Sequence, residues 1–170
     1  MKKLLLIPSI LVLFSCSSQK GGELSKATST LDCPDEGTCT ARIEKNKSLD
    51  IKTDEFGSIY YNLIDDPTKH VIVYDFSKGF DEQLQDSGYR EEILVEIDAA
   101  NPEMELSNFT LEHGKVLFGR LCFCRGATGY FKIREGNLSV KKESDGLKLT
   151  MDFKITEVPQ IINKIDVTIK

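Results

Sequence analysis

Short apolar runs separated by turn residues recur from about residue 32 to the C-terminus, a spacing that is typical of an all-β chain. The alternation of apolar and polar positions is clearest over residues 147–155, LKLTMDFKI. Leucine, methionine, phenylalanine and isoleucine occupy every second position there, with Lys, Thr and Asp between them. This period of two predicts a half-buried antiparallel strand with one wet face. Residues 165–169 repeat the pattern and predict a last strand, separated from the first by Pro159.

Further strands are predicted over residues 38–45, 48–53, 58–63, 70–76, 91–97 and 104–111, and in the segments KVLFGRLCFC, YFKIR and LSVKK. Tight hairpin turns are predicted at His113-Gly114, at Glu135-Gly136-Asn137 and at Ser144-Asp145-Gly146, because Asp-Gly and similar pairs favour two-residue turns. Asp65-Asp66-Pro67 predicts another turn. The one helix that we predict covers residues 80–86, FDEQLQD, with Gly88 as its stop.

About ten strands, at most one short helix and consecutive hairpins predict an all-β fold, either an antiparallel β-sandwich or a meander barrel. A sandwich fills its interior with side chains, whereas a lipocalin-like barrel leaves a cavity for a small apolar ligand. The alternation pattern is the same in both, so the two architectures stay open.

The first fifteen residues have a different pattern. Lys2 and Lys3 precede an apolar run over residues 4–14, interrupted by Pro8 and followed by Ser15-Cys16. A transmembrane helix needs about 20 apolar residues, so this run is too short to stay in the bilayer. A basic start followed by a short apolar segment is the pattern of a secretory signal peptide.

The end of this segment, Leu13-Phe14-Ser15-Cys16, resembles the lipobox of bacterial lipoproteins. The resemblance implies that residues 1–15 are cleaved as a signal peptide and that Cys16 is lipidated, which anchors the protein to a membrane of the cell envelope. Ser17 follows Cys16 where, in the enterobacterial type of sorting, aspartate retains a lipoprotein in the inner membrane. By that analogy we expect the outer membrane, with neither face specified.

Residues 16–31 contain the lipidated cysteine and a small, polar stretch with Gly21-Gly22. This composition predicts a flexible tether that reaches on the order of 20 Å. Residues 32–170 then form a single β domain. The net charge of the chain is −5, and loss of the leader with its two lysines leaves −7. This acidic balance argues against nucleic acid as a partner.

Four cysteines remain in the domain: Cys33, Cys39, Cys122 and Cys124. An even number in an exported chain predicts disulfides. Two residues apart on a strand, Cys122 and Cys124 would have Cα atoms roughly 6.6–6.8 Å apart, above the favoured disulfide separation of about 5.5–6 Å. We therefore favour cross-pairing of the first two cysteines with the last two, and local pairing of Cys33 with Cys39 is the alternative.

If the same four cysteines stayed reduced, their thiolates would suit a soft metal such as Zn²⁺ or Cu(I). This is an alternative to the disulfides, and no cofactor is expected otherwise. Acidic pairs such as Glu91-Glu92 point to opposite faces of a strand and are interpreted as solvated edges. No catalytic motif is recognised, so we expect no enzymatic activity.

The segment 119–131, GRLCFCRGATGYF, combines two arginines, two cysteines, a threonine and a tyrosine with three glycines. Its glycines allow an exposed loop that would present Arg125, Thr128 and Tyr130 to a partner. The plainer interpretation is a glycine-rich turn beside a disulfide. Together these features predict a non-enzymatic envelope lipoprotein that works as a binding or structural module, with an envelope protein or a small ligand as its partner.

Overall fold

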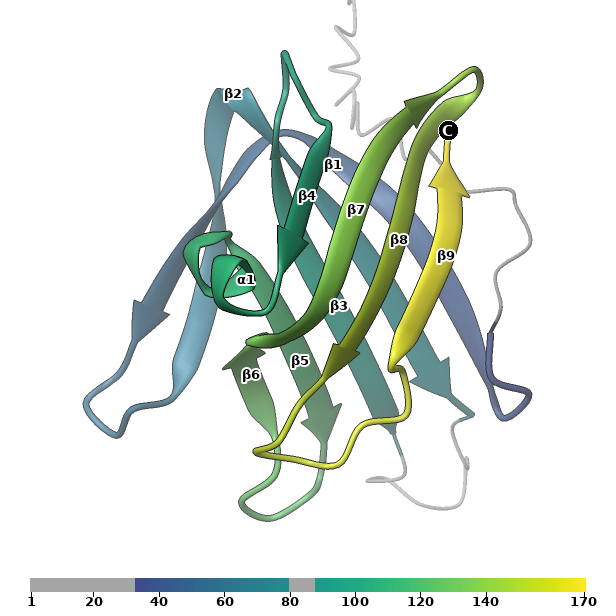
Figure 1. Ribbon diagram of the computed structural model, residues 1–170. Coiled ribbons are helices and arrows are strands. Elements are labelled where there is room, and N and C mark those ends of the chain that lie inside the picture. Colours follow the sequence, from purple (N-terminus) through teal and green to yellow (C-terminus); the bar gives the residue numbers. More distant parts are fainter. Residues whose placement is uncertain (1–32, 80–87) are drawn as a thin grey trace, which may run out of the picture.

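The computed structural model describes residues 33–79 and 88–170, which form two facing antiparallel sheets (Figure 1). The described residues contain nine strands and one short helix. The all-β prediction is therefore confirmed, and of the two architectures the structure has the sandwich. The leader with Cys16, the tether and the predicted helix over 80–86 lie outside the described residues.

The first sheet has five strands in the order β1-β2-β3-β5-β6. Their bounds are β1 Gly37–Thr53, β2 Ile59–Lys78, β3 Tyr89–Asp98, β5 Val116–Cys122 and β6 Gly129–Lys132. The second sheet has four strands in the order β4-β7-β8-β9. Their bounds are β4 Met104–Ser107, β7 Glu135–Glu143, β8 Gly146–Lys154 and β9 Lys164–Ile169. The helix α1, Phe109–His113, connects β4 to β5. No helix among the described residues is long and apolar enough to span a membrane.

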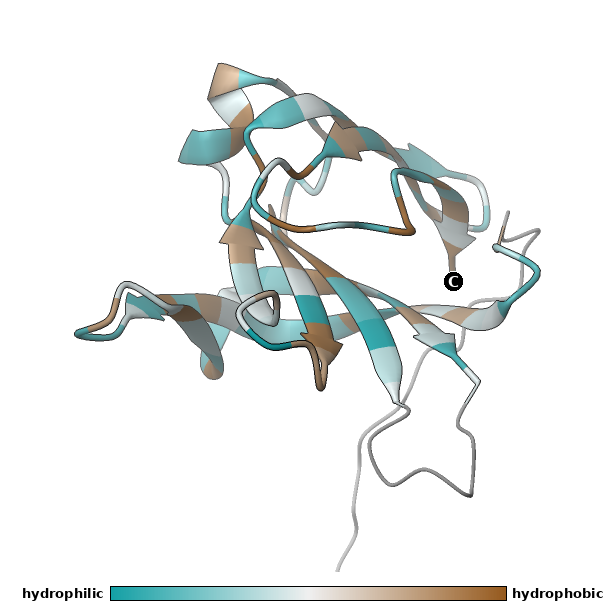
Figure 2. Cartoon of the chain, turned by 90° about the horizontal axis from the view of Figure 1, so that it is seen from below, coloured by the Kyte–Doolittle hydropathy of each residue, from teal (hydrophilic) through white to brown (hydrophobic). Residues whose placement is uncertain are grey.

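The main core lies between the two sheets, which Figure 2 shows from below as two layers. The alternation predicted for β8 is confirmed, because Leu149, Met151 and Phe153 are buried while Asp152 and Lys154 are exposed. Phe153 meets Phe118 of β5 with ring centroids 5.9 Å apart. Side chains from both sheets therefore meet in one core, as expected of a sandwich.

The two longest strands, β1 and β2, bend together halfway along their length. The register between them shifts between Lys45 and Lys47, where Asn46 has a φ of 57°. On β2 the predicted turn at Asp65-Asp66-Pro67 is a corner inside one continuous strand. Asp66 stabilises this corner by accepting hydrogen bonds from the backbone N–H and the hydroxyl of Thr68.

Beyond the corner, residues 47–65 form a hairpin that we call the arm. The arm packs on the outer face of its own sheet, and Ile59 pairs there with Tyr130 of β6. A second, smaller core forms under it from Leu49, Val71, Val73, Leu94 and Leu117, with Ile51, Ile59, Tyr61, Leu63 and Tyr130 packed around them. The five-stranded sheet is thus covered on both faces where the arm lies, while Thr40, Ser77 and Arg90 farther along the strands are exposed.

The hairpin predicted at His113-Gly114 is wrong. The segment 104–111 divides into β4 and the start of α1, and β4 pairs with β7 rather than with β5. The hydroxyl of Thr110 donates to the carbonyl of Ser107 and accepts from its N–H, which closes a turn in place of a longer strand. Leu111 of this helix is fully buried in the main core.

The hairpin predicted at Glu135-Gly136-Asn137 is also wrong, because β6 and β7 belong to different sheets. Gly136 lies where the chain crosses from one sheet to the other, and its N–H donates to the side chain of Asn108. A β-carbon at Gly136 would lie 2.0 Å from the carbonyl oxygen of Asp152, so only glycine fits there. The Asp145-Gly146 hairpin is confirmed, with Glu143 opposite Gly146.

Candidate functional site

A groove, the buried carboxylate of Glu91 and both disulfides lie at one end of the five-stranded sheet. The strand register places Gly37, Lys78, Tyr89 and Cys122 opposite one another in a single row across β1, β2, β3 and β5. This row lies toward the bottom of Figure 1, and we call it the lower end of the sheet. The start of the described chain and the β5–β6 turn are therefore at the same end of the molecule.

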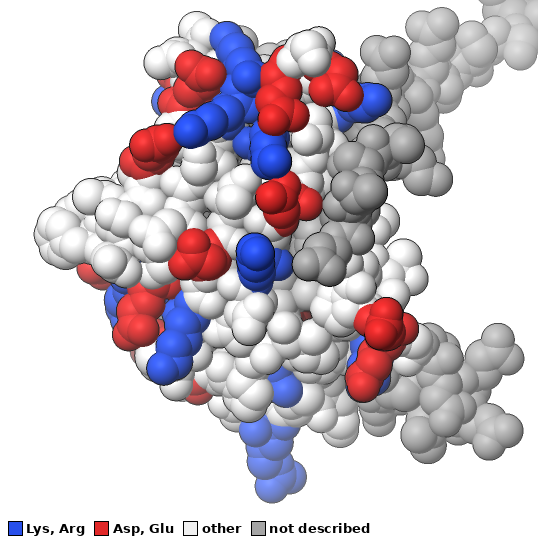
Figure 3. Space-filling view, turned by 45° about the vertical axis from the view of Figure 1, so that its right-hand side comes forward, with Lys and Arg blue, Asp and Glu red and all other residues white. Residues whose placement is uncertain are grey.

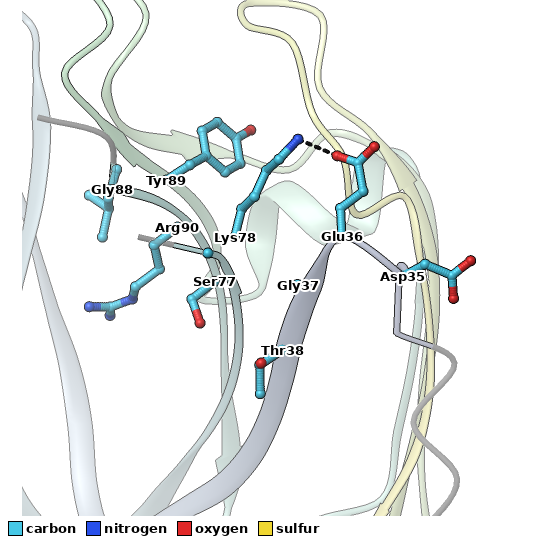
Figure 4. Close-up of a pocket in the computed structure, with 11 residues that line it drawn as sticks. Asp35, Glu36, Gly37, Thr38, Ser77, Lys78, Gly88, Tyr89 and Arg90 are labelled. Carbon is cyan, nitrogen blue, oxygen red and sulfur yellow. Dashed lines mark hydrogen bonds and ion pairs between the residues drawn. The ribbon is translucent and has the colours of Figure 1, made fainter. Parts of the chain in front are cut away.

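A groove of about 680 Å³ opens at the lower end (Figure 4). Its lining includes Thr38, Ser77, Lys78, Tyr89, Arg90 and Leu121. The cations in the groove are already paired, since Lys78 contacts Glu36 and Arg90 contacts Asp75 at 2.8 Å and Glu92 at 2.7 Å. Lys78 in turn lowers the pKa of Glu36 through its hydrogen bond and its charge. The groove therefore offers compensated charges and hydroxyl groups to a ligand.

Two neighbouring residues of β3, Glu91 and Glu92, carry buried carboxylates. Only 0% and 1% of their surfaces are exposed, so the expectation that this acidic pair is solvated is wrong. The expectation that they face opposite sides of the sheet agrees with their contacts. Each side of the sheet supplies its own set of hydrogen-bond donors, and these offset the free-energy cost of burying the two carboxylates.

Glu91 faces the second sheet. Its carboxylate accepts the backbone N–H groups of Ile161 at 2.6 Å and of Ile162 at 2.7 Å, both in the β8–β9 connection, and the hydroxyl of Tyr89 at 2.5 Å. Burial and the hydrogen bond to Glu91 raise the pKa of Tyr89 to about 12. Arg120 closes the cluster, with its Nε donating to the Tyr89 hydroxyl at 3.3 Å. Glu91 thus joins the two sheets at the lower end.

Glu92 faces the arm. The hydroxyls of Tyr61 at 3.1 Å and of Tyr130 at 2.9 Å both donate to its Oε2, and Arg90 donates to its Oε1. The two phenol rings meet edge to face with centroids 5.0 Å apart. Burial, followed by the charge of Glu92, raises the pKa of Tyr61 to about 12 and raises the pKa of Tyr130 as well. Both phenols are therefore neutral donors at neutral pH.

The buried carboxylate sites differ from an acid–base pair. Their lone pairs are occupied by fixed donors, and the sheet itself separates Glu91 from Glu92. A third carboxylate, Glu96, accepts the Ser48 hydroxyl at 2.7 Å, the N–H of Leu49 at 2.7 Å and Lys115 at 3.0 Å. Glu92 and Glu96 together hold the two strands of the arm to the sheet.

The cysteines are joined in two disulfides, as expected of an exported chain, but the favoured cross-pairing is wrong. Cys33 is bonded to Cys39, and Cys122 to Cys124. Cross-pairing fails because β2 and β3 lie between β1 and β5, which separates the two pairs by about three strand spacings, or roughly 14 Å. Cys122 and Cys124 can join because β5 ends at Cys122, and their Cα atoms are 5.2 Å apart.

All four sulfurs of the alternative metal site are thus bonded to one another rather than free as thiolates. Over residues 33–79 and 88–170, no group of three or more His, Cys, Asp or Glu side chains is placed to hold a metal ion.

The β5–β6 turn separates the three residues that the sequence suggested as a recognition surface. Arg125 is exposed near its tip, and Thr128 donates its hydroxyl to the carbonyl of Arg120 at 3.0 Å. Tyr130 instead turns inward to Glu92. The turn also carries a highly exposed aromatic residue that the sequence reasoning had not selected, Phe123, with 81% of its surface accessible.

Elsewhere the surface carries interspersed charges of both signs, as the face in Figure 3 shows. On β8 and β9, for example, Lys148 pairs with Asp166 at 3.2 Å. Neither a known protein family nor a curated protein nor a solved structure matches the chain.

Proposed function

We propose that the protein is a lipid-anchored lipoprotein of the cell envelope whose β-sandwich works as a non-enzymatic binding or structural module. The observation that carries the proposal is the lipobox-like sequence that ends at Cys16, with a polar stretch between it and the folded domain. Two disulfides in the domain are consistent with export, because such bonds persist in oxidising compartments.

The non-enzymatic part of the proposal is supported by the use that the fold makes of its ionisable groups. Glu91, Glu92 and Glu96 each connect two parts of the chain through fixed hydrogen bonds. A general acid or base needs a reachable proton and a substrate beside it. The groove at the lower end contains hydroxyl groups and paired charges, which suit binding of a partner better than catalysis.

Replacement of Cys16 by alanine tests the anchor. The expected result is loss of radioactive palmitate labelling and movement of the protein from the membrane fraction to the soluble fraction. Ser17→Ala, which leaves the acceptor cysteine in place, is the matched control and should stay lipidated. If Cys16→Ala remains membrane-bound, the anchoring proposal is wrong.

We further propose the outer membrane, on the ground that serine rather than aspartate follows Cys16. Ser17→Asp should then move the lipidated protein to the inner-membrane fraction in a host that sorts lipoproteins by this residue. An unchanged distribution between the two membranes in such a host would contradict this assignment.

A carrier of a small apolar ligand is a second candidate; because side chains fill the interior of the sandwich, such a ligand would have to bind in a surface recess, such as the one of about 370 Å³ between the arm and α1. Its lining is mixed, because Leu49, Ile51 and Leu117 lie beside polar side chains such as Asp50, Glu112 and Lys132. Native mass spectrometry of the purified protein tests this candidate, since a bound ligand adds a discrete mass. The same measurement tests the metal-handling alternative, which requires four free thiols and a bound Zn or Cu ion.

A further inference from the structure

The tip of the β5–β6 turn presents a rigid aromatic side chain to the surroundings. Phe123 lies between the bonded cysteines 122 and 124, so a three-residue ring fixes its backbone directly at the end of β5. The side chain is 81% exposed. The ring belongs to neither apolar core of the fold, so it is free to meet a partner.

The register shows where this tip lies relative to the anchor. Gly37 and Cys122 belong to the same row at the lower end, three strand spacings apart, or roughly 14 Å. The described chain enters the sheet at this end from Cys33. Attachment of Cys16 to the membrane would bring the chain to the sheet from the lipid side, so this is the end of the domain that we expect to face the membrane. This step rests on the proposed lipidation of Cys16.

We propose that the β5–β6 turn contacts the lipid surface, with Phe123 inserted at the level of the headgroups and upper acyl chains. Aromatic side chains favour this interfacial region, and an adjacent arginine can extend its cation to the phosphates. Arg125 is exposed two residues away. Because the domain is tethered, its effective concentration at the surface is on the order of millimolar, and a weak contact is enough to orient it.

Charge indicates which kind of surface the turn fits. The net charge of the mature chain is negative, so the chain as a whole is not attracted to anionic lipid. The contact therefore depends on apolar insertion and suits a zwitterionic surface. Two other phenylalanines of the described residues are highly exposed, and they fit less well. Phe56, 83% exposed at the tip of the arm, follows Asp54 and Glu55, whose charges oppose entry into the membrane.

Phe109, 71% exposed on α1, provides a matched control. It precedes β5, whereas Phe123 follows it, and β5 itself spans about 20 Å from Val116 to Cys122. The chain has no tryptophan. Phe123→Trp and Phe109→Trp therefore each introduce a single fluorescent reporter, one at the lower end and one away from it.

The experiment uses the full lipidated protein, reconstituted into phosphatidylcholine vesicles with and without bromine on the acyl chains. In Phe123→Trp we expect a blue-shifted emission that is quenched by the brominated lipid and protected from acrylamide. In Phe109→Trp we expect emission that is unaffected by the bromine and open to acrylamide.

Sedimentation of the vesicles distinguishes the two proposals. Protein that does not sediment with the vesicles contradicts the lipid anchor itself. Protein that sediments while the reporter at position 123 stays unquenched overturns the membrane contact and leaves the turn as a surface for a protein partner. Equal quenching at positions 109 and 123 also overturns it, because the domain then has no preferred orientation.

Discussion

At the scale of single residues, Glu91 and Glu92 show how one strand connects three parts of the molecule. Their alternation along β3 sends one carboxylate to the β8–β9 connection and the other to the arm. The opposite orientation follows from the sequence, because side chains alternate on any strand. Their burial did not follow, since the donors lie at Ile161, Tyr61 and Tyr130, and only tertiary structure brings these to β3.

Glu91→Gln should lower the free energy of unfolding by about 2–4 kcal/mol, because two backbone N–H groups and a phenol lose a charged acceptor in a buried place. Urea unfolding followed by circular dichroism measures the change. Glu105→Gln removes an exposed carboxylate on β4 and should change stability by less than about 0.5 kcal/mol. Equal changes in the free energy of unfolding for the two substitutions would contradict the structural role of Glu91.

The phenols of Tyr61 and Tyr89 predict a loss of stability at alkaline pH. An unfolded tyrosine ionises at a pKa of 10.0, whereas the pKa of each of these two is raised to about 12 in the fold. The unfolded chain therefore loses these protons first, so stability is unaffected below about pH 10 and falls as the pH rises toward 12.

The measurement is urea unfolding at about pH 9 and about pH 11, with phenolate absorbance recorded at each pH. Tyr61→Phe should make the alkaline fall shallower, and Tyr60→Phe, which changes the exposed neighbour, should leave it as it is. A stability that stays flat across this interval in the unmodified protein would contradict the assignment.

At the scale of elements, the positions of the strands were easier to predict than the pairing of the strands in the sheets. The sequence located most of the strands and the Asp145-Gly146 turn, because alternation and turn residues are local signals. It missed that β4 joins the second sheet and that the arm folds back on the first. Both depend on long-range packing, such as the burial of Leu111 and the seating of Tyr130 against Gly119.

Gly119→Ala tests how tightly the arm and β6 are packed. A β-carbon at this position would lie 2.6 Å from Cε1 of Tyr130. The ring has to move, which disturbs its hydrogen bond to Glu92, so we expect a loss of about 1–3 kcal/mol in unfolding free energy.

Gly79→Ala is the matched control, since nothing lies within 4 Å of a β-carbon there and its φ is not positive. It should leave the urea midpoint almost unchanged. The packing argument is wrong if alanine at 119 is tolerated as well as alanine at 79.

At the scale of the whole molecule, the two sheets are held by their shared core and by Glu91, and neither disulfide crosses between them. Cys33–Cys39 spans six positions at the start of β1, and Cys122–Cys124 spans two at the end of β5. Local bonds of this kind restrict the unfolded chain only slightly, with about 2 kcal/mol expected for the first and about 1.5 kcal/mol for the second. Cross-pairing over about 90 residues would have contributed more, on the order of 4–5 kcal/mol.

Removal of the disulfides should therefore weaken the sandwich without abolishing it. The double variant Cys33→Ala/Cys39→Ala should lose more stability than Cys122→Ala/Cys124→Ala, because Cys39 is also packed in the main core and leaves a cavity. Both variants should keep one cooperative unfolding transition, since the apolar contacts between the sheets remain. Mass spectrometry of a non-reduced digest should yield one fragment for each local bond. A fragment that joins the N-terminal cysteines to β5, or a variant with no cooperative transition, would mean that the disulfides hold the molecule together rather than its core.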